Sequence, residues 1–173
     1  MKHLKLLSIL FFVTIAQTFA QTNKETTKKI VADKNYVFMA NTALPMSNQD
    51  ISQVLRSMQG VQGGGTINLS GSQYDLKVTA DSIVAYLPYY GRAYSAPYNP
   101  TDGGIKFTSK DFTYTESKNK KGLYIINIRT KDLKNDNYQI YLSISQNGYA
   151  SLMMNSNNKQ SITFNGVLEE SKK

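Results

Sequence analysis

Imidazole and thiol groups, on which much acid–base and nucleophilic catalysis depends, are almost missing from this sequence. The chain contains one histidine, His3, and no cysteine. We expect His3 to be removed with an N-terminal signal, which leaves the rest of the protein without Ser-His-Asp or Cys-His catalysis and without His- or Cys-based zinc sites. We therefore expect no catalytic residue, no metal site and no cofactor, and we interpret the protein as a non-enzyme.

Carboxylates, lysines and serines are the remaining candidates for chemistry. Ser-x-x-Lys occurs at residues 117–120 and 156–159, but both lie on expected hairpin turns, and the partner motifs of serine–lysine enzymes are missing. Paired carboxylates could support glycoside hydrolysis, and spacing alone leaves four candidates open: Asp75, Asp102, Asp111 and Glu116. Turn formation and surface charge explain these residues more simply. A carboxylate-dependent hydrolase is the least favoured function.

Two further segments have only a partial likeness to ligand sites. Asp132, Asn135, Asp136 and Asn137 carry the oxygens that calcium prefers, but the glycine and terminal glutamate of an EF-hand loop are missing. Residues 63–65 are three glycines, without the Gly-Lys-Ser/Thr that completes a phosphate-binding loop. We interpret the first segment as a polar hairpin loop and the second as a hinge.

One segment has the composition of a recognition surface. Residues 86–100 are rich in tyrosine and are stiffened by three prolines. Tyrosine offers a flat apolar ring with a polar tip at low entropic cost, and Arg92 could stack on a ring or hold an anion. The alternative is that the rings fill one end of a barrel as core. We predict a ligand-binding site made of Tyr86, Tyr89, Tyr90, Arg92, Tyr94 and Tyr98.

The elements that must position this segment are β-strands. Beyond Gly65 apolar residues alternate with polar ones at a period of two, and Asn147-Gly148 is a strong hairpin signal. The fold class is mainly β, an antiparallel meander of about seven to nine strands that closes into an open barrel or a sandwich. Charges such as Asp75 and Lys77 on the face opposite the apolar set favour a soluble sheet over a membrane barrel.

One or two short helices are expected in the N-terminal third. An i, i+3, i+4, i+7 stripe behind a Ser47 cap predicts a helix over residues 47–58. Residues 21–35 are polar and Lys-rich, which indicates a flexible leader or a short helix. We place a single β-rich domain at residues 36–168 and a charged tail at residues 169–173.

The N-terminus predicts export. Lysines precede an apolar run from Leu6 to Ala16, and Thr18-Phe19-Ala20 forms a small-x-small pattern before Gln21. Because the run is shorter than the roughly 20 residues of a spanning helix, we expect a signal peptide over residues 1–20, cleaved near Ala20/Gln21. The protein is then periplasmic or secreted, is not membrane-spanning after cleavage, and is not a lipoprotein since it lacks cysteine.

The charge distribution argues against a nucleic-acid partner. The formal net charge is +8, but the lysines are spread over turns and ends, and arginine is scarce. A nucleic-acid footprint would gather Lys and Arg on one face with stacking aromatics between them. We expect no nucleic acid as partner.

Four blocks of the sequence carry a family resemblance. They are LPYYGRAY at residues 87–94, GGIKF at 103–107, NGYA at 147–150 and NSNNKQSI at 155–162. Together, over about residues 36–168, they resemble the Bacteroidetes family known as domain of unknown function 4251. The resemblance implies a secreted or periplasmic protein and carries no activity with it. Many members are lipoproteins, and the missing cysteine departs from that pattern.

These observations favour a function by contact. We expect a non-catalytic binding or interaction module of the cell envelope, with the tyrosine-rich segment and the barrel mouth meeting an apolar or carbohydrate-like ligand. The alternative is a structural or accessory envelope protein without a small ligand. An open cavity lined by tyrosines and Arg92 would favour the first function, and a solid core the second.

Overall fold

The computed structural model describes residues 22–46, 61–62, 65–94, 103–134 and 136–171. The signal peptide expected at residues 1–20, the helix expected at 47–58 and Tyr98 lie outside the described residues. Within them, no helix is long and apolar enough to cross a membrane.

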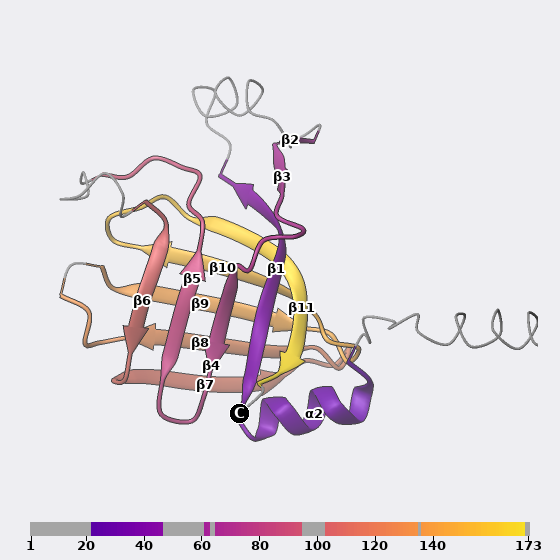
Figure 1. Cartoon of the computed structure of the whole chain (residues 1–173). Helices are drawn as coiled ribbons and strands as arrows, with labels where there is room; N and C mark the ends of the chain where they lie inside the picture. Colours follow the sequence, from indigo (N-terminus) through magenta and orange to yellow (C-terminus); the bar gives the residue numbers. More distant parts are fainter. Residues whose placement is uncertain (1–21, 47–60, 63–64, 95–102, 135, 172–173) are drawn as a thin grey trace, which may run out of the picture.

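Antiparallel strands make up most of the described chain, which confirms the predicted mainly-β class (Figure 1). They alternate between buried and more exposed residues, as in β9, where every second side chain is buried. The strands are β1 (Tyr36–Pro45), β2 (Val61–Gln62), β3 (Thr66–Asn68), β4 (Asp75–Val78), β5 (Ile83–Leu87), β6 (Ile105–Ser109), β7 (Phe112–Lys118), β8 (Tyr124–Thr130), β9 (Tyr138–Ile144), β10 (Tyr149–Ser156) and β11 (Ile162–Glu170).

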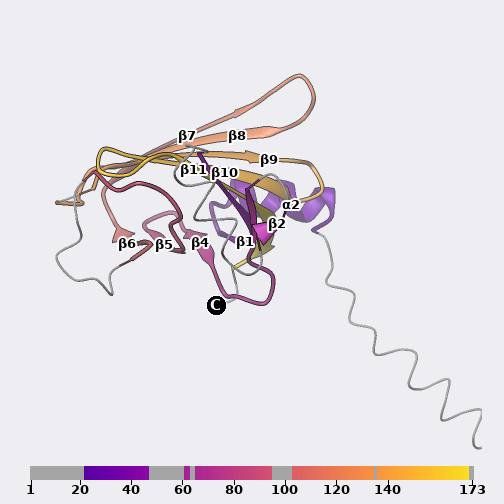
Figure 2. The same ribbon diagram turned by 90° about the horizontal axis from the view of Figure 1, so that it is seen from above.

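The sheet folds back on itself into a nearly closed barrel. Its order is β6-β5-β4-β1-β11-β10-β9-β8-β7, with the short β2–β3 pair attached to β1. In Figures 1 and 2, β4–β6 with β1 form one layer, and β7–β10 form a second layer that crosses it steeply. The strand order ends at β6 and β7, so the described barrel stays open along the seam between these two edges.

The long pairing of β1 with β11 joins the two layers. The register shifts between Ala40 and Thr42, which marks a β-bulge at Asn41. Opposite the bulge a side chain has no room, because a Cβ at Gly166 would lie 1.9 Å from the carbonyl oxygen of Met39. The close approach of β1 and β11 therefore requires glycine at position 166.

The interior of the barrel is filled by side chains. Both layers contribute apolar residues that are almost fully buried, and this packed core accounts for the alternation along the strands. The largest of them include Tyr36, Phe38, Leu76, Ile83, Leu87, Ile126, Ile140, Leu142 and Phe164. Within the described residues, the structure therefore has the packed core that the sequence analysis associated with a structural role.

The helix α2 (Lys24–Ala32) packs at one end of the barrel (Figure 1). Asn23 caps it by accepting a hydrogen bond from the Thr26 backbone N–H at 2.8 Å. Ile30 and Val31 are buried in the core, so of the two expectations for residues 21–35 the short helix is correct. Helix α2 covers the end opposite the loops described below.

Several boundaries differ from those expected. The alternation beyond Gly65 predicts a strand over residues 83–89, but β5 ends at Leu87, since Pro88 has no N–H for the ladder. A short strand from Tyr36, closed by a turn at Pro45, is also expected from the sequence, but β1 itself runs through to Pro45. The strand β3 was not predicted. β11 continues through Glu169 and Glu170, so part of the segment assigned to a tail pairs with β1.

Candidate ligand-binding site

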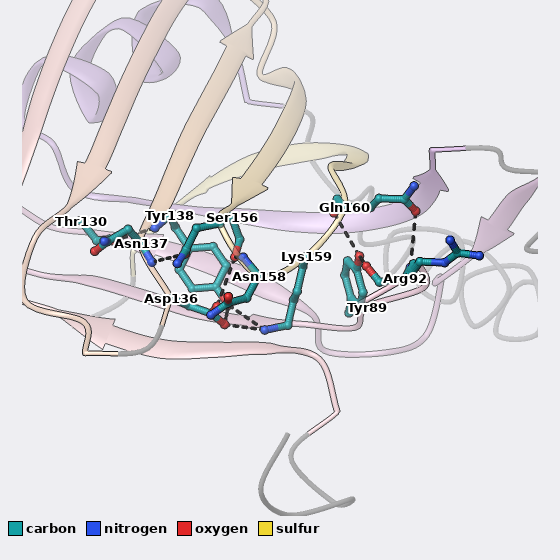
Figure 3. Close-up of polar contacts among 11 residues, drawn as sticks. Tyr89, Arg92, Thr130, Asp136, Asn137, Tyr138, Ser156, Asn158, Lys159 and Gln160 are labelled. Carbon is teal, nitrogen blue, oxygen red and sulfur yellow. Dashed lines mark hydrogen bonds and ion pairs between the residues drawn. The ribbon is translucent and has the colours of Figure 1, made fainter. Parts of the chain in front are cut away.

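The tyrosine-rich segment leaves β5 and then lies against the loop between β10 and β11 (Figure 3). The Gln160 backbone N–H donates to the carbonyl oxygen of Arg92 at 3.1 Å, and the Tyr94 N–H donates to the carbonyl oxygen of Asn158 at 2.8 Å. An isolated bridge pairs Ala93 with Lys159. These backbone contacts fix residues 92–94 beside a loop some 65 positions later in the chain.

The side chain of Tyr89 links residues 92–94 to the loop between β10 and β11, and we call this contact the loop brace. Its hydroxyl donates to the carbonyl oxygen of Arg92 at 2.8 Å and lies 3.1 Å from that of Gln160. Burial raises the pKa of Tyr89 to about 12. A Cβ at Gly91 would lie 2.6 Å from the Tyr89 hydroxyl, so the missing side chain lets the ring fold under the loop. Tyr89 is therefore a structural residue.

An ion pair lies beside this brace at the same end of the barrel (Figure 3). The Lys159 Nζ and the Asp136 Oδ2 are 2.5 Å apart, with side chains only 20% and 18% exposed. The Tyr138 hydroxyl donates to the same carboxylate at 3.0 Å, and the Ser156 hydroxyl lies 3.3 Å from its other oxygen. The pair ties the loop before β9 to the loop after β10.

The electrostatics of the pair follow from these contacts. Burial opposes ionisation of Asp136, but hydrogen bonds from Lys159, Asn158 and Tyr138 together outweigh burial and lower its pKa. Burial and the nearby Asp136 charge raise the pKa of Tyr138. In the Ser-x-x-Lys segment at residues 156–159, the Lys159 ammonium and the Ser156 hydroxyl thus both contact the Asp136 carboxylate.

Asp132, the other aspartate of the calcium-like segment, binds the turn between β6 and β7. It accepts from the Ser109 hydroxyl at 2.5 Å and from the backbone N–H groups of Lys110 and Asp111 at 2.7 and 3.2 Å. These bonds, led by that from Ser109, lower the pKa of Asp132 to about 2. Donor groups satisfy this carboxylate, so it ties the turn between β6 and β7 to the segment that follows β8. Within the described part of the chain, no group of three or more His, Cys, Asp or Glu could hold a metal ion.

Tyr86 lies elsewhere, on the outer side of the β4–β6 layer. The strand register places Asp75, Tyr86 and Lys106 next to one another across β4, β5 and β6. Tyr86 is 46% exposed, and its ring stacks on that of Tyr74, with centroids 5.9 Å apart and planes 26° apart. The Lys106 Nζ lies 5.1 Å from the centroid of the Tyr86 ring.

Polar groups border this pair of rings. A hollow of about 580 Å³, open to the outside, is lined by Ser72, Gln73, Tyr74, Asp75 and Tyr86. Partial burial raises the pKa of Asp75, and Lys77 partly offsets that effect. We call this set, with Lys106, the Tyr74–Tyr86 surface. It combines two aromatic faces with hydroxyl, amide, carboxylate and ammonium groups.

The structure divides the six predicted site residues among different places. Tyr86 belongs to the Tyr74–Tyr86 surface. Tyr90 is half-buried, and burial, with Tyr74 acting in the same direction, raises its pKa. Tyr89 and Arg92 belong to the loop brace, Tyr94 is 65% exposed, and Tyr98 lies outside the described residues. In the described part of the chain, Tyr89, Arg92 and Tyr94 thus lie at the loop between β10 and β11, and Tyr86 lies on the β4–β6 layer.

Sequence reasoning missed Tyr74 and Lys106 as partners of Tyr86. Tyr74 precedes β4 by one residue, and its carbonyl oxygen accepts from the Ala40 N–H of β1 at 2.9 Å. Lys106 comes from β6, after a long connection. The turn at Asp81-Ser82 fixes the register of β4 against β5 and so places Asp75 opposite Tyr86. This turn is the sequence feature from which that pairing could have been predicted.

Comparison with known proteins adds a family and a fold. A family model described as "Domain of unknown function (DUF4251)" matches residues 19–168. A crystal structure of a DUF4251 family protein from Bacteroides eggerthii DSM 20697 is similar, with a TM-score of 0.55 and 15% identity over 85% of this chain and 87% of that chain. At this identity the likeness concerns the fold alone. Among curated proteins, none matches this sequence.

Proposed function

This chain belongs to the DUF4251 family of domains of unknown function, and we propose that it is an exported protein that binds its ligand without chemical turnover. The resemblance seen in the four sequence blocks is confirmed by the family match. The family carries no activity, so the function must be inferred from this chain's own surface.

The exposed ring of Tyr86, stacked on the partly buried ring of Tyr74 beside a polar hollow, is the observation that carries the proposal. Large aromatic side chains are usually covered when packing is their only role, and Tyr86 is 46% exposed at the centre of three strands. Rigid strands hold the rings in place, so a ligand would meet a preorganised surface at low entropic cost.

A carbohydrate-like ligand fits this surface best. The apolar face of a sugar ring packs on aromatic rings, and sugar hydroxyls both donate and accept hydrogen bonds. Gln73 and Ser72 offer groups of both kinds, Asp75 accepts and Lys106 donates. The neutral, hydroxyl-rich chemistry of such a ligand matches a surface where the Asp75 carboxylate lines the hollow and the Lys106 ammonium lies over the Tyr86 ring.

The N-terminal sequence supports an envelope location. Residues 1–20 combine a basic start, an apolar run and a small-x-small pattern, as secretory signals do. We therefore propose that the protein works in the periplasm or outside the cell, as a binding module of the envelope.

Titration calorimetry with neutral glucan oligosaccharides tests the proposal. We expect the processed chain to bind cellohexaose or laminarihexaose, and Tyr86→Ala to weaken that binding about tenfold by removing one ring of the platform. Tyr149→Ala is the matched control, because Tyr149 is also exposed, at 58%, but lies on β10 in the other layer. Absence of binding to both sugars, or equal loss in both variants, would contradict the proposal.

A structural or accessory role without a small ligand is the second candidate. The filled barrel interior and the Tyr89 brace favour it, because both use aromatic rings for packing. Under this role Tyr86→Ala would change neither sugar binding nor any other small-ligand contact.

A further inference from the structure

The outer side of the β7–β10 layer is a second surface with a distinct chemistry. This layer forms one side of the molecule in Figure 2, with β4–β6 on the other side. The strand register aligns Thr113, Arg129, Gln139 and Asn155 in one row across β7, β8, β9 and β10. A neighbouring row places Asn127 beside Tyr141. All of these side chains point away from the core.

Two hollows meet near one end of this surface, where β8 ends and β9 begins. One, of about 200 Å³, is lined by Thr113, Thr115, Asn127, Ile128, Arg129, Gln139, Ile140 and Tyr141. The other, of about 610 Å³, is lined by Arg129, Thr130, Lys131, Asn137, Gln139, Asn155, Ser156 and Asn157. Arg129 and Gln139 line both hollows, so the two form one groove, which we call the Arg129 groove.

The charge of the groove has a single sign. Arg129 and Lys131 are cationic, and none of the other residues that line the two hollows is a carboxylate. Lys131 also faces Asp111, at 3.8 Å between the Nζ and the Oδ1, but both side chains are about half exposed or more, so water screens that pair strongly. Along the outward positions of the fully described strands β7–β10, Arg129 is the one charged residue.

The rest of the groove is made of amides, hydroxyls and one ring. The Tyr141 hydroxyl donates to the Gln139 Oε1 at 3.2 Å, which holds ring and amide side by side. Tyr141 is 38% exposed, and Asn127 lies next to it. The sheet thus presents a flat ring, several amides and a guanidinium on a rigid support.

We propose that the Arg129 groove binds an acidic polysaccharide, through the carboxylate of a uronic acid residue. The guanidinium of Arg129 is a planar donor that matches a carboxylate with two parallel hydrogen bonds. The amides of Asn127, Gln139 and Asn155 match sugar hydroxyls, since both kinds of group donate and accept. The Tyr141 ring offers a face for a sugar ring.

An acidic peptide fits less well. A peptide strand gains most of its affinity by adding to the edge of a sheet, whereas the Arg129 groove lies across the face of four strands. This inference is independent of the Tyr74–Tyr86 surface, which lies on the other layer and carries a carboxylate in its hollow.

Calorimetry at about 0.15 M salt, where long-range charge effects are screened, tests the groove. The probes are the hexamers of galacturonate and mannuronate, the methyl ester of the galacturonate hexamer, and hexaglutamate. We expect at least one uronate hexamer to bind and, in that case, Arg129→Gln to weaken binding about tenfold, in line with the loss of a charge-assisted pair. For galacturonate, the methyl ester should bind about tenfold more weakly than the acid.

Matched controls separate the groove from general charge and from the first surface. Lys28→Gln removes one charge from an exposed position of α2 and should change affinity less than about twofold. Tyr86→Ala should leave uronate binding unchanged, and Gln139→Ala should weaken it. The proposal is overturned if neither uronate hexamer binds, or if Arg129→Gln lowers the affinity for the uronate no more than Lys28→Gln does. It is also overturned if hexaglutamate binds as tightly as the uronate hexamers.

Discussion

The Lys159 ammonium lies 2.5 Å from the Asp136 carboxylate at a point where both side chains are four-fifths buried. A buried carboxylate that loses its cation keeps the cost of burial without the compensating attraction. We therefore expect Lys159→Met to destabilise the protein by about 2 kcal/mol, less than for a fully buried pair because Tyr138 and Ser156 still donate to Asp136. Urea denaturation measures this change.

A double-mutant cycle shows whether the effect belongs to the pair. Asp136→Asn removes the charge that Lys159 neutralises, so Lys159→Met should cost much less in the Asp136→Asn background than in the wild type. If the two changes simply add, the ion pair does not link the loops as the structure indicates.

Acid stability should depend on Asp132. Its pKa is lowered to about 2 by hydrogen bonds from Ser109 and the turn backbone, against about 3.9 in an unfolded chain. A lowered folded-state pKa contributes stability that is present above the unfolded value and is lost as pH falls through the folded value. The melting temperature should therefore fall between about pH 4 and pH 2, and this fall should be smaller in Asp132→Asn.

Asp81→Asn provides the control for that measurement. Asp81 is also an exposed aspartate on a turn, where it accepts from the Thr79 hydroxyl at 2.7 Å. In the described chain this bond stays within the β4–β5 turn, whereas Asp132 binds a turn other than its own. An identical acid profile for Asp132→Asn and wild type would show that Asp132 does not hold the turn.

Gly166 should tolerate no side chain. The Cβ of Gly166→Ala would lie 1.9 Å from the Met39 carbonyl oxygen, which is backbone and has little room to shift. We expect a loss of about 3 kcal/mol or failure to fold. Gly103→Ala is the control, because nothing lies within 4 Å of its added Cβ. Equal stability of the two variants, compared by thermal unfolding, would show that β1 and β11 can separate easily.

The Tyr89 hydroxyl should matter for stability more than an exposed one. Tyr89→Phe removes the donor to Arg92 and leaves carbonyl oxygens partly unsatisfied, so we expect a loss of about 1 kcal/mol. Tyr94→Phe, at a side chain that is 65% exposed, should change stability by less than about 0.5 kcal/mol. Urea denaturation measures the free energy of unfolding of both variants. Equal losses in Tyr89→Phe and Tyr94→Phe would show that the Tyr89 hydroxyl does not stabilise the loop.

Local features of this fold could be read from the sequence. Alternation along β9 and β10 follows from one buried face, and the turn between them has glycine at position 148, where φ is +80°. Pairings between distant segments could not be read in this way. β1 pairs with β11, which comes from the other end of the chain, and the bulge at Asn41 in this pairing has no signal in the sequence.

The candidate site could be predicted only in part, because its residues come from segments that are distant in the sequence. Tyr86 was singled out by composition, but its partners come from β6, from β4 and from the residue before β4, and the β5–β6 register depends on a long connection. Tyr89 has the same composition signal and a different role, because β5 ends at Leu87 and the chain then turns under the loop at Gly91. Asp136 and Lys159 were dismissed as loop residues, since nothing in one sequence brings two loops together.

Chemical-shift mapping tests the binding function most directly. The processed chain, labelled with nitrogen-15, is titrated with cellohexaose and with laminarihexaose, and the backbone amide shifts are assigned. We predict that the largest shifts fall at Tyr74, Asp75, Tyr86 and Lys106, and that Tyr86→Ala needs about tenfold more sugar to reach the same shifts. Absence of shifts with both sugars, or shifts confined to the β7–β10 layer, would contradict a binding role for the Tyr74–Tyr86 surface.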